Sequence, residues 1–248
     1  MENYILECCV DSVESAINAA KGGASRLELC SNLIIGGTTP DAALVKEIRK
    51  YTDIRIHALI RPRFGDFCYT MHEMEIMKSQ IRALKEAGVE GIVIGVLNED
   101  GDLDIPKMKA LIQEAEGLSI TLHRAFDMCR DPYQVLEEAV DLGVRTILTS
   151  GQKQSAWEGR QLLAELVEKA DRRIDIMAGA GIGAAVIEKL QPVTKGISYH
   201  MSGKVTLESP MKYRKADVNM GLPSLSEYEI WQTSENAVRE AVEVLKHI

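Results

Sequence analysis

Acidic, thiol, imidazole and guanidinium side chains recur at alternate positions inside short apolar segments of this sequence. The set comprises two glutamates, two cysteines, three histidines and an arginine: Glu7, Cys9, Glu28, Cys30, His57, His123, His200 and Arg61. Alternate residues of a strand lie on one face, so these side chains share one face and their apolar neighbours share the other. A layer of mutually satisfied charges is the plainest explanation, because buried ionisable groups require partners. Apolar residues would fill the same space, so the set favours a functional pocket.

Two of these segments repeat one pattern, a glutamate followed two residues later by a cysteine, at Glu7/Cys9 and at Glu28/Cys30. Neighbouring parallel strands lie less than about 5 Å apart, so Cys9 and Cys30 present two thiolates to one ion if the strand registers match. A soft ion such as Cu(I) prefers thiolate ligands. Free cysteine is also a common small core residue, so packing is the alternative explanation for both thiols.

A second group of residues is suited to binding an anion. Residues 177–183 (MAGAGIG) bring three glycines to the end of a predicted strand, and Ser202 ends the next one. Parallel barrels often bind phosphate at these two places, through exposed N–H groups and a helix N-terminus. We therefore expect Gly179, Gly181 and Ser202 to hold a phosphate or carboxylate group, with tight turns as the alternative explanation of the glycines.

Acid–base catalysis is the third chemistry that these residue types allow. Carboxylates, imidazoles and guanidinium groups in one cleft suit proton transfer on an oxygenated or carboxylated substrate. The candidate catalytic residues are Glu7, Glu28, Arg61, His123, Asp127 and His200. The two glutamates, together with His123 and His200, could also hold a harder divalent ion. No nucleophile elbow, Walker loop or dinucleotide fingerprint follows the first predicted strand.

Eight strand-like segments alternate with eight amphipathic helical segments, and these elements must position the candidate residues. The predicted strands are 4–10, 26–30, 55–61, 91–97, 119–126, 145–150, 175–180 and 196–203. The predicted helices are 12–22, 40–51, 72–87, 104–116, 132–142, 155–170, 183–190 and 235–247. Eight such units predict an α/β fold, a (β/α)8 TIM barrel, as a single domain over residues 1–248, with a doubly wound open sheet as the alternative. Residues 204–234 form a long connection that we expect to be a lid or an oligomer contact.

Composition limits the classes of partner. The chain has 248 residues, of which 29 are basic and 37 acidic, for a net charge of −8. General nucleic-acid binders and anionic-membrane binders rely on basic patches, so we expect neither kind of partner. No apolar run approaches the roughly 18 residues of a membrane span. Five cysteines are an odd number, which fits reduced thiols in the cytoplasm better than a disulfide framework.

Seven phrases together resemble the CutC copper-homeostasis protein family, in order and at the expected spacing. They are ILECCVDS (5–12), GASRLELCSNLIIGGTTP (23–40), RPRFGDFCY (61–69), HRAFDMC (123–129), LTSGQK (148–153), IMAGAGI (176–182) and SPMKYR (209–214). The resemblance implies a single barrel, a cytoplasmic location, copper homeostasis and a homo-oligomer, dimeric or larger. In the family, the cysteine of the ELC phrase is a proposed Cu(I) ligand, which here is Cys30; Cys9 as its partner is inferred from strand geometry.

The sequence departs from the family pattern in two strands. Leu122 stands where the family usually has an aromatic residue, which should change packing only. Ser198 stands where the family usually has a glutamate, two residues before His200. If that glutamate belongs to the family's site, this chain differs in activity or in metal preference.

Two functional hypotheses follow from these patterns. The first is a cytoplasmic copper-homeostasis protein of CutC type that binds Cu(I) through cysteine thiolate. The alternative is a TIM-barrel enzyme that performs acid–base or metal-assisted chemistry on a small phosphate- or carboxylate-bearing substrate.

Overall fold

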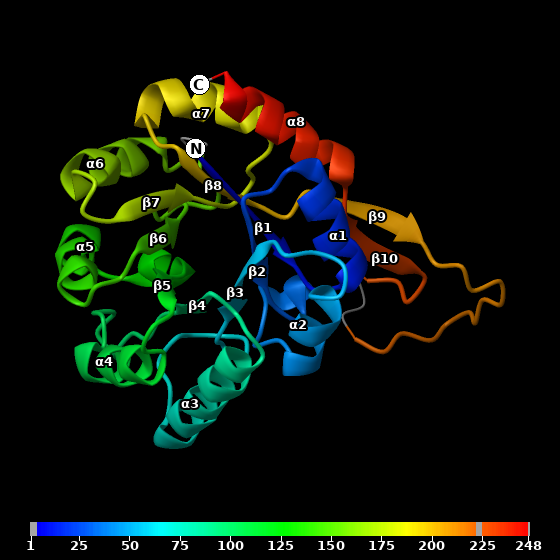
Figure 1. Ribbon diagram of the computed structural model, residues 1–248, viewed down its shortest axis with the longest axis horizontal. Coiled ribbons are helices and arrows are strands. Elements are labelled where there is room, and N and C mark those ends of the chain that lie inside the picture. The colour runs from blue at the N-terminus through cyan, green and yellow to red at the C-terminus, as the bar shows by residue number, and fades with distance from the viewer. Residues whose placement is uncertain (1–3, 222–224, 248) are drawn as a thin grey trace.

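Eight parallel strands close into a barrel in the computed structural model, which describes residues 4–221 and 225–247. The strands follow one another around the barrel in chain order, and a helix connects each strand to the next (Figure 1). The predicted TIM barrel is therefore confirmed. The strands are β1 (Ile5–Val10), β2 (Arg26–Leu29), β3 (Arg55–Leu59), β4 (Gly91–Ile94), β5 (Ser119–Leu122), β6 (Thr146–Thr149), β7 (Asp175–Ala178) and β8 (Ser198–Met201). The helices are α1 (Val13–Gly22), α2 (Ala42–Ile48), α3 (Met71–Glu86), α4 (Ile105–Glu114), α5 (Pro132–Asp141), α6 (Arg160–Ala170), α7 (Ala184–Thr194) and α8 (Glu235–Lys246), with short 3-10 turns η1 (Leu33–Ile35) and η2 (Arg124–Met128).

Side-chain alternation along the strands produces two layers. On β1, Leu6, Cys8 and Val10 are fully buried in the hydrophobic core between the strands and the helices, whereas Glu7 and Cys9 point into the barrel. Burying one aliphatic side chain stabilises the fold by about 1.5–3 kcal/mol. The apolar residues therefore decide which face of each strand lies under the helices, and the ionisable residues occupy the interior as a consequence.

Side-chain caps fix where most helices begin. Thr70 and Glu73 form a complete capping box at the start of α3. Such caps satisfy N–H groups that have no partner within the helix. Serine or aspartate side chains cap five further helices: Ser12, Asp41, Asp104, Asp131 and Ser234.

The sixth helix begins at Arg160 and not at residue 155 as the periodicity predicts. The N–H of Ala156 donates instead to the carbonyl of Ala180, 3.0 Å away in the loop after β7. Gly159 packs so closely on the loop after β6 that a Cβ there would lie 1.9 Å from the carbonyl oxygen of Ser150. These tertiary contacts override the local helical pattern between residues 151 and 159.

The long connection contains two strands that the sequence pattern does not reveal. Strands β9 (Lys204–Glu208) and β10 (Glu229–Thr233) form an antiparallel pair, with Trp231 opposite Thr206. The described residues of this segment, 204–221 and 225–233, are called the arm, and Figure 1 shows β9 and β10 projecting from the barrel beside α1. Its base is tied to α1, because Ser15 Oγ accepts the N–H of Thr233 at 3.1 Å.

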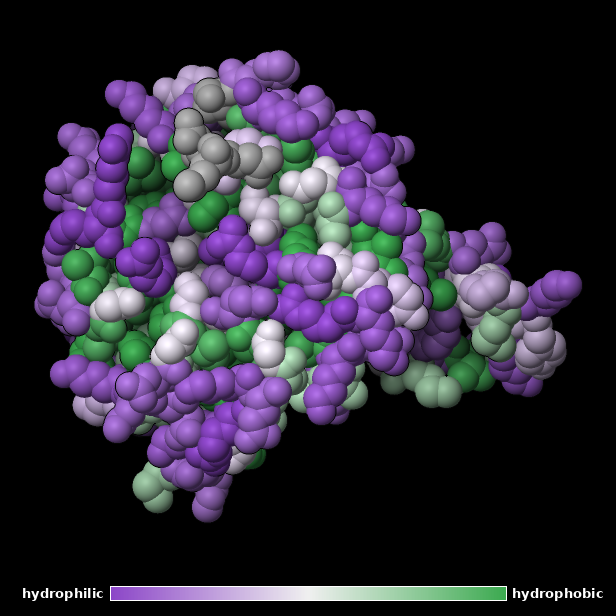
Figure 2. All heavy atoms as spheres, in the orientation of Figure 1, coloured by the Kyte–Doolittle hydropathy of each residue, from purple (hydrophilic) through white to green (hydrophobic). Residues whose placement is uncertain are grey.

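Hydrophilic side chains cover most of the outer helices on the face seen in Figure 2. The arm differs, because it exposes several apolar side chains: Val205, Leu207, Met211, Tyr213 and Ile230. Within residues 4–221 and 225–247, no helix combines the length and the apolar character that crossing a bilayer requires.

Candidate functional site

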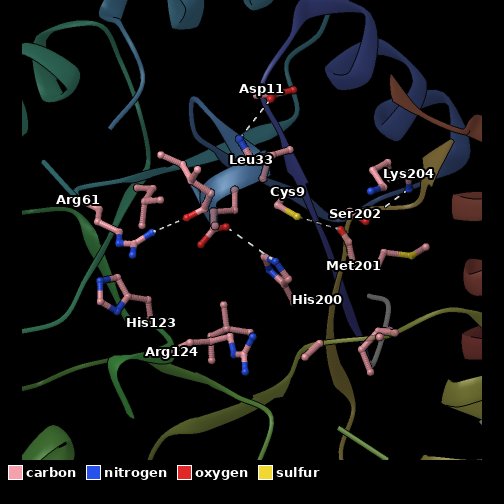
Figure 3. A pocket seen from close by; sticks show the side chains of 18 of the residues that line it. Cys9, Asp11, Leu33, Arg61, His123, Arg124, His200, Met201, Ser202 and Lys204 are labelled. Atoms are coloured by element: carbon pink, nitrogen blue, oxygen red, sulfur yellow. Dashed lines mark hydrogen bonds and ion pairs between the residues drawn. The ribbon is translucent and has the colours of Figure 1, made fainter. Parts of the chain in front are cut away.

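A pocket of about 620 Å³ opens at the carboxyl end of the barrel. Its walls come from residues that end or follow the strands, where active sites of this fold lie. Five polar residues of the sequence set line it: Cys9, Glu28, Arg61, His123 and His200. Figure 3 shows Cys9 and His200 on one side, and Arg61 and His123 on the other. The apolar part of the wall includes Leu33, Ile35, Leu59, Phe67, Met128, Leu148 and Ile182.

The register of the barrel brings Cys9, Glu28 and His200 together. Cys9 on β1 lies opposite Glu28 on β2, and Glu7, one inward position earlier, lies opposite His200 on β8. Cys9 Sγ, a carboxylate oxygen of Glu28 and a ring nitrogen of His200 all lie within 4.8 Å of one another. Cys9 and Glu28 are buried and His200 is partly exposed, so the group faces the pocket from its floor.

Glu7 lies beneath this cluster and does not line the pocket. Its carboxylate accepts a hydrogen bond from Arg26 Nε at 2.5 Å and contacts His200 Nδ1 at 2.8 Å. Burial alone would raise the pKa of Glu7, but the charges of Arg26 and His200 outweigh it and hold the pKa well below the ordinary value. Glu7 is therefore an anion that orients the imidazole of His200 and leaves its Nε2 toward Glu28, 3.8 Å away.

Glu28 and His200, two members of the cluster, both have raised pKa values. Burial raises the pKa of Glu28 to about 7, against the lowering effect of the His200 charge. Burial lowers the pKa of His200, but Cys9, Glu28 and the Glu7 hydrogen bond raise it well above its ordinary value. Glu28 can thus gain or lose a proton near neutral pH, which suits a general acid or base.

The other two interior histidines, His57 and His123, have lowered pKa values. Burial, with the charge of Arg26, lowers the pKa of His57 to about 4. Burial, with the charge of Arg61, lowers the pKa of His123 to about 3. Both rings are therefore neutral at physiological pH. His57 lies deeper in the barrel and does not line the pocket, whereas His123 does.

Cys30 lies outside the pocket wall. Its side chain packs with Leu59, Val93 and Leu33 in a small apolar cluster, and Sγ donates to the carbonyl of Val10 at 3.5 Å. Burial raises the pKa of this thiol well above its ordinary value. The register pairs Cys9 with Glu28, so the two thiols do not lie at the same level of the barrel, as matching registers would require.

Arg61 and His123 are held rigidly on the far side of the pocket. The Arg61 guanidinium donates to three carbonyl oxygens, those of Ile35, Gly37 and Gly65, and His123 Nδ1 accepts the N–H of Ala125 at 3.1 Å. The His123 ring packs against backbone that only glycine allows, because a Cβ on Gly95 would lie 2.5 Å from its Cε1.

Asp127 has its acceptor capacity filled by the protein. Its oxygens accept hydrogen bonds from Arg124 Nε at 2.6 Å, from the Thr149 hydroxyl at 2.5 Å and from the N–H and hydroxyl of Ser150. Gln152 N–H also donates to it. These contacts join η2 to the loop after β6. Both Asp127 and Arg124 line the pocket, and the contacts of Asp127 orient the Arg124 side chain.

Of the three predicted anion-binding residues, two line the pocket and one does not. Gly181 and Ser202 line the pocket, while Gly179 lies behind it against Leu148, whose Cδ1 would be 2.6 Å from an added Cβ. Gly181 has φ +77 and follows Ala180 with φ +73, so two successive residues take the left-handed conformation here. This turn leads into the N-terminus of α7.

Several residues in or beneath the pocket are not predicted by the sequence patterns. Arg26 lies two residues before Glu28 on the same strand, so alternation places both side chains on the inward face. This alternation is the sequence signal that could have identified Arg26. Asp11 directly follows β1 and lines the pocket, where burial raises its pKa. Trp231 reaches the pocket from the arm, with Lys204 Nζ 3.2 Å from the centre of its ring. No local pattern marks Trp231. Ser198 does not line the pocket; its hydroxyl donates to Asp175 at 2.7 Å.

Comparison with known proteins gives a consistent result. A model described as the CutC family matches residues 4–205. A family protein CutC from Histophilus somni is 42% identical over 233 residues, 94% of this chain and 96% of that protein. Another from Parabacteroides distasonis is 44% identical over 237 residues, 95% of this chain and 98% of that protein.

Solved structures add evidence on the fold. CutC from Streptococcus agalactiae, named for copper homeostasis, superimposes with a TM-score of 0.77 at 30% identity, over 80% of this chain and 98% of that one. A thiamine phosphate pyrophosphorylase from Pyrococcus furiosus superimposes with a TM-score of 0.59 at 15% identity, over 99% of this chain and 97% of that one. The second likeness concerns the barrel fold alone.

Proposed function

Because this chain belongs to the CutC family, we propose that it takes part in copper homeostasis and binds a copper ion as its cargo at Cys9, Glu28 and His200. The observation that carries this proposal is the convergence of a thiol, a carboxylate and an imidazole within 4.8 Å at the floor of the pocket. Thiolate and imidazole are ligands that copper ions accept, and thiolate favours Cu(I) in particular.

The donor set fits a metal ion after a small adjustment. Ligand atoms around a tetrahedral ion with bonds of about 2.0–2.3 Å lie roughly 3.5 Å apart. The His200–Glu28 separation of 3.8 Å is close to that value, and all three ligand atoms lie within 4.8 Å of one another, so a small inward movement of a side chain would complete the site. Glu7 supports the site from below, since a carboxylate on the second ring nitrogen fixes the tautomer and orientation of a ligating histidine.

Cys30 stays a predicted Cu(I) ligand by the family resemblance, and the contacts around it favour packing instead. Its thiol is surrounded by Leu33, Leu59 and Val93, away from the pocket. A copper ion on Cys30 would have to displace these apolar side chains. We therefore assign the principal thiolate to Cys9.

Competition for Cu(I) with a chromophoric chelator tests this assignment. We expect Cys9→Ser to weaken Cu(I) affinity more than about tenfold, a loss of about 1.4 kcal/mol or more. Cys129→Ser is the matched control, because Cys129 is another buried free thiol but does not line the pocket. Unchanged affinity in Cys9→Ser would overturn the proposal, and a loss confined to Cys30→Ser would move the ion to the site that the resemblance implies.

A second candidate function, chemistry on a small organic molecule, is favoured by the size of the pocket. A volume of about 620 Å³ lies in the range of pockets that enclose small ligands, and one ion would fill little of it. Glu28, which titrates near neutrality, and neutral His123 would then face a substrate as acid–base and hydrogen-bonding groups. Turnover of a candidate substrate that Glu28→Gln abolishes would support this function.

A cytoplasmic location and a homo-oligomeric state are part of the same proposal. All five cysteines are free thiols, as expected in a reducing compartment. The arm exposes Val205, Leu207 and Ile230, and an isolated two-stranded ribbon is marginally stable in water. A second copy of the chain packed on the arm would bury these side chains.

A further inference from the structure

Arg61 is a buried cation without an anionic partner in the described part of the chain. The residue is only 8% exposed. The groups around the guanidinium are neutral: the three carbonyl oxygens of Ile35, Gly37 and Gly65, and the Phe67 ring at 5.3 Å. A buried charge is costly unless it is paired. Carbonyl dipoles offset part of that cost, and an anion in the pocket would offset more.

His123 supplies an unused donor on the same side. Its Nδ1 accepts the N–H of Ala125, so the neutral ring carries its proton on Nε2. Nε2 is fully buried and has no hydrogen-bond partner, although the residue lines the pocket. Leaving a buried donor unsatisfied is unfavourable. The Phe67 ring lies 4.8 Å from the His123 ring and also contacts the Arg61 guanidinium, so it packs against both polar residues.

From these two residues the geometry points to a binding subsite for a small organic anion, whose carboxylate or phosphate group is held by Arg61 and by the Nε2–H of His123. Charge-assisted hydrogen bonds to such oxygens are among the stronger polar contacts. The inference deepens the second candidate function and rests on it for the identity of the pocket, but it does not require a bound copper ion.

The rest of the pocket indicates the kind of molecule that carries the anionic group. Beside Arg61 and His123 the wall is mainly apolar: Leu33, Ile35, Leu59, Phe67, Met128 and Leu148. Arg124 adds a second cation to the wall, although Asp127 already pairs with it. We therefore expect an acid with an apolar body rather than a bare inorganic ion to bind best.

Calorimetric titration with phenylacetate, acetate, inorganic phosphate and the neutral benzyl alcohol tests the subsite. The full chain is titrated with a metal chelator present, so that a failure of copper binding and a failure of anion binding are separate results. We expect phenylacetate to bind more tightly than acetate, and benzyl alcohol to bind at least about tenfold more weakly than phenylacetate. Absence of saturable binding by both phenylacetate and phosphate at concentrations on the order of 10 mM would overturn the inference.

Two variants locate the subsite within the pocket. His123→Asn keeps an oxygen that can accept the N–H of Ala125 but removes the Nε2 donor, and we expect about tenfold weaker phenylacetate binding. Arg61→Gln should weaken binding by at least as much, and thermal melting shows whether that variant is folded. His57→Asn is the matched control, because His57 is an equally buried histidine that does not line the pocket. Equal affinity in the wild type and in folded His123→Asn would assign the anion to another place and refute the subsite.

Discussion

Replacing Glu7 with glutamine tests how far the charged layer under the pocket stabilises the barrel. Glu7 is completely buried and Arg26 nearly so, and their side chains meet at 2.5 Å. Glutamine keeps the shape of the side chain but leaves the Arg26 charge without its carboxylate. Because water cannot screen a pair at this depth, we expect the free energy of unfolding to fall by about 3–5 kcal/mol.

An exposed ion pair of the same chemistry provides the control. Arg173 and Glu137 form a two-pronged contact at 2.6 and 2.8 Å, but their side chains are 42% and 55% exposed. Solvent screens such an exposed pair, so the pair contributes little to stability. Glu137→Gln should therefore cost much less than Glu7→Gln, although both changes remove one carboxylate from an arginine.

Urea unfolding of the wild type, Glu7→Gln, Arg26→Met and the double variant completes the test. Removing both partners eliminates the unpaired charge, so the double variant should lose clearly less stability than the sum of the two single variants. The reasoning is refuted if Glu7→Gln costs no more than Glu137→Gln. Additive costs in the double variant would equally contradict a direct pairing between Glu7 and Arg26.

Three further predictions concern the barrel interior and the arm. Gly91→Ala places a Cβ 2.6 Å from the His57 ring and should lower the free energy of unfolding in urea by about 1–3 kcal/mol. Gly221→Ala is the control, because its Cβ meets open space, and it should change stability by under about 0.5 kcal/mol. A similar cost in both variants would contradict the packing argument. The pKa of His57 is about 4 in the folded chain and near 6.5 when unfolded, so only the unfolded chain gains this proton between those values and stability falls as pH is lowered. Between pH 6.5 and 5 the wild type should lose about 1.5 kcal/mol more than His57→Gln, and parallel pH profiles would count against this. Replacing residues 206–231 with a short turn should lower the number of subunits per particle, measured by light scattering. An unchanged number of subunits would exclude the arm as the oligomer contact.

The eight strand–helix units of the sequence predict the barrel, and alternation within the strands predicts its two layers. Leu6, Cys8 and Val10 alternate with Glu7 and Cys9, and a strand has a period of two, so burial of the apolar set forces the other set inward. The same argument correctly places Glu28, His123 and His200 in the interior. It requires no knowledge of distant residues.

Only the tertiary structure decides which interior residues meet. Cys9 lies opposite Glu28, and Cys30 is enclosed by apolar side chains, because register depends on how all eight strands close around the barrel. The ionisation of His200 and of His123 differs for a similar reason. Burial lowers the pKa of both rings, but Cys9, Glu28 and Glu7 from other strands outweigh it at His200, whereas Arg61 adds to it at His123. Alternation is a property of neighbours in the chain, whereas register, burial and charge environment arise from residues far apart in sequence. The sequence therefore determines the candidate residues, and the closed barrel determines their partners.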